Sequence, residues 1–99
     1  MEFMSRTRLP RRALSSPLRN EYASVGEAVR HLRTRAGLSQ EELGLNSDVH
    51  PTWVSNIECG KVNVTHRTVV NVAGGIGIRY SQIVSLAEAY EEIAEAQDD

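Results

Sequence analysis

The side chains best suited to chemistry lie between residues 50 and 60, where short polar groups share one side of an expected helix. At about 100° per residue, Thr52 and Asn56 fall roughly opposite Val54, which marks the apolar side, and Ser55 lies about 100° from it, beside Asn56 on the outward side. Their hydroxyl and amide groups offer hydrogen-bond donors and acceptors on short stems. Such groups suit the base edges in the major groove of DNA. A helix that only kept a domain in solution would usually carry Lys and Glu at these positions.

Other kinds of chemistry find little support in the sequence. It contains no recognisable nucleophile–base pair, paired carboxylates or phosphate-binding loop, so we expect no enzymatic activity and no cofactor. His31, His50 and His66 do not stand at ligand spacing from Cys59, so we expect no metal site. A redox role for Cys59 is a minor alternative, because no basic cluster beyond Lys61 is evident that would activate its thiol.

Two short helices joined by a tight turn are expected to position the polar side chains. Ser39 and Glu42 form a capping box at the start of the first helix. Residues 46–48, Asn-Ser-Asp, should interrupt it, because such side chains bond their own backbone and tolerate left-handed conformations. Pro51 suits the first turn of the second helix, and Gly60 can close that helix. Two helices joined in this way form a helix-turn-helix.

Three motifs extend this pattern along the chain. They read V-R-x-L-R-x-x-x-G-L-S-Q-E-E-L at 29–43, V-S-N-I-E-x-G-K at 54–61 and V-A-x-x-I-G-I-x-Y-S-Q-I at 72–83. On these motifs the chain resembles the lambda-repressor and Cro class of helix-turn-helix regulators, also called the xenobiotic-response-element family. The resemblance implies an all-α fold, with a five-helix DNA-binding domain, a helix-turn-helix and an extended C-terminal helix.

The resemblance also implies which residues touch DNA. The family residue at Gln40 contacts a phosphate and braces the recognition helix, which we expect at about 51–59. Asn56 is the strongest base-reading candidate, because an Asn amide can bond adenine through two hydrogen bonds. The alternative for both residues is an ordinary solvated surface. The base-reading candidates are His50, Pro51, Thr52, Ser55 and Asn56. The phosphate candidates are Ser39, Gln40, Trp53, Lys61, Asn63 and Arg67.

Arg33 and Glu58 match a family pair that joins the first and third helices of the fold. Glu58 falls on the inward side of the recognition helix, close to Val54 and Ile57. A buried acid needs a partner, because removing an unpaired charge from water is costly. We therefore expect a structural ion pair between Arg33 and Glu58.

Composition and charge are consistent with a small DNA-binding protein. A chain of 99 residues supports one small domain, and no apolar run is long enough for a membrane span. A single Cys fits a reducing cytoplasm. The net charge of −2 hides a gradient, because residues 1–20 carry five Arg and one Glu, whereas residues 85–99 carry six acids and no base. The distribution of charge steers binding more than its sum does.

The chain divides into three expected parts. Residues 1–23 form a basic N-terminal arm, which is either a disordered, solvated tail or a segment that lies on phosphates or enters the minor groove. Residues 24–84 form the DNA-binding domain, whose first helix should begin with a capping box of Ser24 and Glu27. Residues 85–99 form an acidic helical extension.

Two further helix boundaries follow from glycine and from capping residues. The fourth helix should start after Thr65 and end near Gly74, because Gly74-Gly75 is a poor helical sequence. The fifth should begin at Tyr80 or Ser81 and run past Ala94.

The last helix carries an apolar stripe that exceeds the expected domain. It can fold back on its own domain, or it can pair with a second subunit, which we favour because surplus apolar stripes usually find a partner. The dimerisation candidates are Ile83, Leu86, Ala87, Tyr90, Ile93 and Ala94.

The sequence is compatible with two functions. The first is a homodimeric, sequence-specific transcription regulator that binds double-stranded DNA at a two-fold symmetric operator. The alternative is an antitoxin that neutralises a partner toxin and regulates its own gene through the helix-turn-helix. A partner protein, either a toxin or RNA polymerase, belongs to both possibilities.

Overall fold

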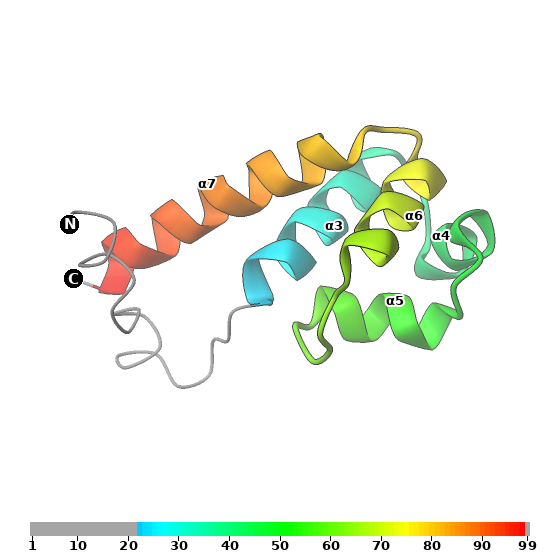
Figure 1. Ribbon diagram of the computed structural model, residues 1–99, viewed down its shortest axis with the longest axis horizontal. Helices are drawn as coiled ribbons and strands as arrows, with labels where there is room; N and C mark the ends of the chain where they lie inside the picture. The colour runs from blue at the N-terminus through cyan, green and yellow to red at the C-terminus, as the bar shows by residue number, and fades with distance from the viewer. Residues whose placement is uncertain (1–21, 99) are drawn as a thin grey trace.

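The computed structural model describes residues 22–98, and these form five α-helices, which confirms the expected all-α fold (Figure 1). The helices are α3 (Ala23–Arg35), α4 (Gln40–Ser47), α5 (Pro51–Glu58), α6 (His66–Ile76) and α7 (Tyr80–Asp98). The expected N-terminal arm at 1–23 lies outside the described residues except for its last two positions.

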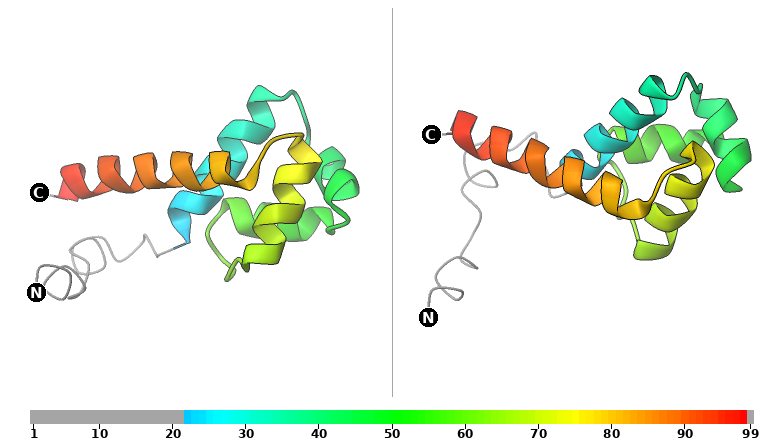
Figure 2. Two further views of the ribbon diagram at one scale, coloured as in Figure 1. Left: turned by 45° about the horizontal axis from the view of Figure 1, so that its top comes forward. Right: turned by 90° about the horizontal axis from the view of Figure 1, so that it is seen from above.

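Helix α3 is the central element of the domain. It contacts α5 on one side and α7 on another, whereas α4 packs against both α5 and α6. Figure 2 shows the C-terminal end of α7 extending beyond the other helices. The helix-turn-helix of α4 and α5 therefore lies on a different side of α3 from the C-terminal helix (Figure 1).

The start of α4 and its end at Asp48 have the expected chemistry, whereas Asn46 and Ser47 continue the helix and do not interrupt it. The Ser39 hydroxyl accepts from the Glu42 amide at 3.0 Å, and the Glu42 carboxylate accepts from the Ser39 amide at 2.8 Å, so the capping box is present. Asp48 closes α4 in a left-handed conformation, with φ at 58°. A Cβ on Gly44 would lie 2.5 Å from the Val49 carbonyl oxygen, so glycine permits the close approach of the turn to α4.

The start of α3 differs from the expected one. Ser24 and Glu27 do not form a capping box, because the helix begins earlier, at Ala23, and its N-cap residue is Tyr22. Ser24 lies inside the helix, where it is buried and donates its hydroxyl proton to the Glu91 carboxylate of α7. A contact between two distant helices therefore replaces the local contact that the sequence suggested.

Helix α6 also runs further than expected, through Gly74 and Gly75 to Ile76. Gly75 is buried against α4, where an added Cβ would lie 2.1 Å from the Ser47 hydroxyl oxygen. The Asn46 amide of α4 donates to the Gly75 carbonyl at 3.1 Å. Packing against α4 thus outweighs the low helix propensity of the glycine pair.

The apolar stripe of α7 corrects the dimerisation candidates. Ile83 and Ala87 belong to the core of their own domain, and Ala94 is buried as well. These three residues fold back on the chain and are not available to a second subunit, because α7 packs along α3. Leu86 and Tyr90 are half-buried at the edge of the core, and Ile93 remains 53% exposed. The core consists of Ala28, Val29, Leu43, Val54, Ile57, Val72, Ala73, Ile83 and Ala87.

Candidate nucleic-acid interface

A buried network of charged and polar side chains holds α5 against the domain. The Arg33 Nε atom of α3 donates to Glu58 Oε2 at 2.6 Å, and Arg33 Nη2 donates to Glu58 Oε1 at 3.0 Å. The two side chains are 11% and 3% exposed, so the expected ion pair is present and buried. Arg33 Nη1 also donates to the Leu38 carbonyl at 2.8 Å, which fixes the loop before α4.

Gln40 joins this network from the first turn of α4. Its side-chain amide donates to Glu58 Oε1 at 3.0 Å. Glu58 therefore accepts from two helices at once, and its hydrogen bond raises the pKa of Arg33, although burial lowers that pKa in part. Gln40 is half-buried as a result. These contacts fix the angle between α4 and α5.

The two sides of α5 differ as the helical geometry predicts. Val54 and Ile57 are buried in the core. Thr52 is exposed on the other side of the helix, whereas Ser55 and Asn56 are half-buried. The inward side thus holds the helix, and the outward side carries short polar groups.

A close backbone contact also holds α5 against α3. A Cβ on Gly26 of α3 would lie 2.3 Å from the Ile57 carbonyl oxygen and 2.7 Å from that of Glu58. Only glycine allows α3 to approach the end of α5 so closely. The sequence analysis did not single out Gly26, and the only available signal was a glycine near the start of an expected helix.

His50 has a structural role that the sequence reading also overlooked. It is the N-cap of α5, and its Nδ1 atom accepts from the Thr52 amide at 3.1 Å. Pro51 occupies the first position of the helix, as expected. The Pro that follows His50 was the signal for a cap, although His is not among the usual N-cap residues.

Most phosphate candidates lie on the surface. Ser39, Lys61, Asn63 and Arg67 are exposed, and Trp53 is 41% exposed at the edge of α5. The loop that carries Lys61 and Asn63 starts close to α5, because the Lys61 amide donates to the Asn56 carbonyl at 2.9 Å. Arg67 follows at the start of α6, which Thr65 caps by accepting from the Thr68 amide at 3.1 Å.

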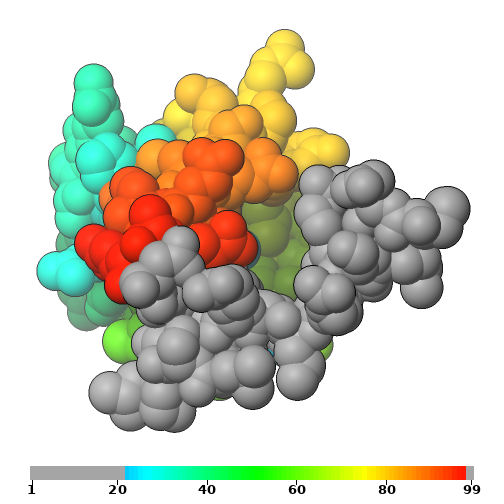
Figure 3. Space-filling view, turned by 90° about the vertical axis from the view of Figure 1, so that its left-hand side faces the viewer, coloured from blue at the N-terminus to red at the C-terminus, as the bar shows by residue number. Residues whose placement is uncertain are grey.

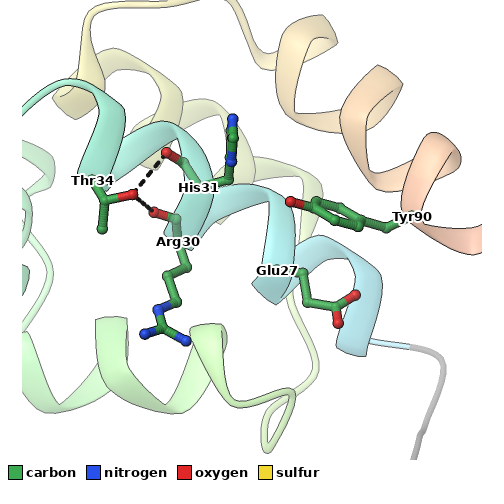
Figure 4. A pocket seen from close by; sticks show the side chains of 5 residues that line it. All are labelled: Glu27, Arg30, His31, Thr34 and Tyr90. Atoms are coloured by element: carbon green, nitrogen blue, oxygen red, sulfur yellow. Dashed lines mark hydrogen bonds between the residues drawn. The ribbon is translucent and has the colours of Figure 1, made fainter.

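A second surface is an open groove between α3 and α7. It is lined by Glu27, Arg30, His31, Thr34 and Tyr90. Figure 4 shows the Tyr90 side chain reaching from α7 toward α3. The Thr34 hydroxyl lies 2.9 Å and 3.0 Å from the carbonyl oxygens of Arg30 and His31, so it bonds the backbone of its own helix.

The remaining reactive groups are few within residues 22–98. Cys59 is a free, exposed thiol just after α5. No three His, Cys, Asp or Glu side chains of the described part of the chain come together as a metal site. Among the described helices, none has the length and apolar character needed to cross a membrane.

Comparisons with known proteins agree with this geometry. Residues 24–95 match the helix-turn-helix domain family. The control protein C.BamHI of Bacillus amyloliquefaciens is 33% identical over 55 residues, which are 54% of this chain and 68% of that protein.

Solved structures resemble the whole fold. The clp gene regulator ClgR of Corynebacterium glutamicum has a TM-score of 0.77 and 25% identity, covering 84% of this chain and 88% of that one. The restriction-modification controller protein C.AhdI of Aeromonas hydrophila has a TM-score of 0.62 and 30% identity, covering 64% of this chain and 96% of that one. These relatives are named as control or regulator proteins. The chain therefore belongs to the helix-turn-helix domain family, and it is a DNA-binding transcription regulator of lambda-repressor-like fold rather than an enzyme.

Proposed function

We propose that the chain acts as a homodimer that inserts α5 of each subunit into the major groove of a two-fold symmetric operator. The observation that carries this proposal is the outward side of α5, where Thr52, Ser55 and Asn56 stand on a helix fixed by buried contacts. In a dimeric helix-turn-helix protein the half-sites lie one DNA turn apart, about 34 Å. We expect the operator of this protein to show that spacing.

The contacts fall into two groups with different consequences. Thr52, Ser55 and Asn56 read base edges, with His50 and Pro51 at the entrance of the groove. The second group of side chains contacts phosphates, which holds the domain in register on the DNA but carries no sequence information. This group consists of Ser39, Gln40, Trp53, Lys61, Asn63 and Arg67.

The distribution of charge supports this orientation. The exposed acids Glu88 and Glu92 lie on α7, and α3 separates α7 from α5. The acidic helix is thus kept away from the phosphates, which would repel it. A regulator that binds genomic DNA in this way works in the cytoplasm.

The dimer surface that we propose on α7 is smaller than the apolar stripe expected from the sequence. Since Ile83, Ala87 and Ala94 are buried, the candidates still available are Leu86, Tyr90 and Ile93. Leu86 and Ala89 line a groove beside His31 and Arg35 of α3. Figure 3 shows the end of α7 at the surface beside α3. Leu86, Ala89 and Ile93 share this flank of α7, and we propose that it meets the same flank of a second subunit.

Selection of bound sites from random duplex DNA, with sedimentation of the complex, tests the DNA contact. We expect an enriched palindrome that is bound by a dimer. The Asn56→Ala and Thr52→Ala variants should lose this preference. Asn71→Ala is the matched control, because Asn71 is an exposed Asn of α6 outside the proposed interface. A folded protein that enriches no sequence would contradict base reading by α5.

Two Glu substitutions on α7 test the dimer surface. Ile93 is 53% and Val84 is 42% exposed, so neither substitution disturbs the core. The two residues lie on opposite flanks of the helix, about 180° apart. Ile93→Glu should give a monomer by sedimentation and weaken operator binding, whereas Val84→Glu should leave the dimer intact. Equal behaviour of the two variants would reject this interface.

A further inference from the structure

The first turn of α5 leaves one backbone amide without a backbone partner. Pro51 has no amide hydrogen, and the amides of Trp53 and Val54 both donate to the His50 carbonyl, at 2.8 Å and 3.2 Å. The Thr52 amide is the one that remains, and the His50 ring accepts from it at 3.1 Å through Nδ1. His50 therefore satisfies the whole first turn with its carbonyl and its ring.

This contact determines the state of the imidazole. A backbone amide can only donate, so Nδ1 must carry a lone pair and no hydrogen. A neutral imidazole has one N–H group, which must then be on Nε2. We infer that the cap locks His50 in the Nε2–H tautomer and aims this donor outward, so that His50 is a fixed hydrogen-bond donor to DNA at the start of the recognition helix.

The position of the ring specifies what it meets. His50 is exposed, and its two ring nitrogens point in different directions, so Nε2–H points away from the amide that Nδ1 caps. In helix-turn-helix proteins the N-terminal residues of the recognition helix reach the base edges. The contact rests on the proposed insertion of α5 into the major groove. Its partner is an acceptor, either a purine N7 or guanine O6 atom or a phosphate oxygen.

The tautomer can be tested on the full chain without DNA. Long-range proton–nitrogen correlation spectra at about pH 8 distinguish the two neutral forms of a histidine ring. The signals are assigned with the His31→Gln and His66→Gln variants. We expect the Nε2–H form for His50 and no single fixed form for the exposed His31 ring. An Nδ1–H form, or an equal mixture at His50, would overturn the inference.

The donor can be separated from the cap by two substitutions. His50→Asn keeps a side chain that caps helices well, but this side chain ends short of the position of Nε2. His50→Ala removes both the cap and the donor. We expect His50→Asn to melt within about 2 °C of the wild type, and His50→Ala to melt about 5 °C lower, because the cap is lost.

The binding assay uses the highest-affinity duplex selected by the wild-type protein, together with an unrelated duplex. His50→Asn should bind the selected duplex about 5- to 10-fold more weakly, the size of one lost hydrogen bond. A loss confined to the selected duplex indicates a base edge, and an equal loss on both indicates a phosphate. Unchanged affinity would reject the donor role. If the wild type selects no duplex, the proposed function and this DNA contact both fail, whereas the spectra still decide the tautomer.

Discussion

Removing the carboxylate of Glu58 tests how α5 is held. In the Glu58→Ala variant Arg33 loses two hydrogen bonds, from Nε at 2.6 Å and from Nη2 at 3.0 Å. Gln40 loses its bond of 3.0 Å to the same carboxylate. The guanidinium keeps only its contact with the Leu38 carbonyl. The variant therefore leaves a buried cation without its counter-charge.

The expected loss is large for a domain of this size. Breaking one partner of a buried ion pair costs about 3–5 kcal/mol. A folded domain of about 75 residues has a net stability of about 4–11 kcal/mol. Since 1 kcal/mol corresponds to about 4–8 °C in a domain of this length, the Tm should fall by at least about 12 °C. Replacing both partners, as in Arg33→Met with Glu58→Leu, should cost less, because no unpaired charge remains.

The Tm values of the wild type, Glu58→Ala and the double variant are measured by calorimetry. Glu88→Ala is the control, because Glu88 is an exposed acid of α7 and its loss should change stability by less than about 0.5 kcal/mol. An unchanged Tm for Glu58→Ala would refute the reasoning. So would a double variant that is as unstable as the single one, because the loss would then not come from an unpaired charge.

The pH dependence of this loss follows from the raised pKa of Arg33. A raised pKa means that the stabilisation is fully present below the pKa of the unfolded state. It is lost only as the pH rises through the higher pKa of the folded state. The Arg33 guanidinium therefore stays charged at neutral and moderately alkaline pH in both states. The difference in Tm between the wild type and Glu58→Ala should therefore stay constant between about pH 7 and 10.

Three more substitutions have expected outcomes. Gly75→Ala should lower the Tm, because the new Cβ would lie 2.1 Å from the Ser47 hydroxyl oxygen; a stabilised variant would show that α4 and α6 can separate freely. Asp48→Gly should raise stability by up to about 1 kcal/mol in chemical denaturation, because φ at this residue is 58°. Arg67→Ala should weaken binding to all duplexes equally. It should also reduce the slope of the logarithm of the binding constant against the logarithm of the salt concentration by about one. A loss confined to one sequence would assign Arg67 to base reading.

Local chemistry made much of the fold predictable from the sequence. The capping box of Ser39 and Glu42 and the left-handed Asp48 depend on neighbouring residues, and both are present. The inward position of Glu58 followed from helical periodicity, and its pairing with Arg33 followed from the family resemblance. These features involve either one turn of backbone or a motif that many proteins share.

Contacts between distant helices were not predictable in this way. Ser24 is of a residue type that often caps helices, but its hydroxyl donates to the Glu91 carboxylate, 67 positions further along the chain. Gly75 suggested the end of a helix and Gly26 was not singled out, whereas both are sites where two helices touch. The periodicity of α7 showed an apolar stripe without showing what covers it, and α3 covers most of it. The DNA contacts of individual side chains stay predictions.

The attachment of α5 has a consequence for how this protein can acquire new operators. Helix α5 contacts the domain through the side chains of Val54, Ile57 and Glu58 and through its backbone carbonyls beside Gly26. None of these groups faces outward. The outward residues can therefore be exchanged without weakening the fold, so a duplicated gene could change its target through a few mutations. His50 is the exception, because a mutation there alters the helix start and the proposed DNA contact together. Libraries built to retarget the protein should vary the outward positions and restrict residue 50 to capping side chains.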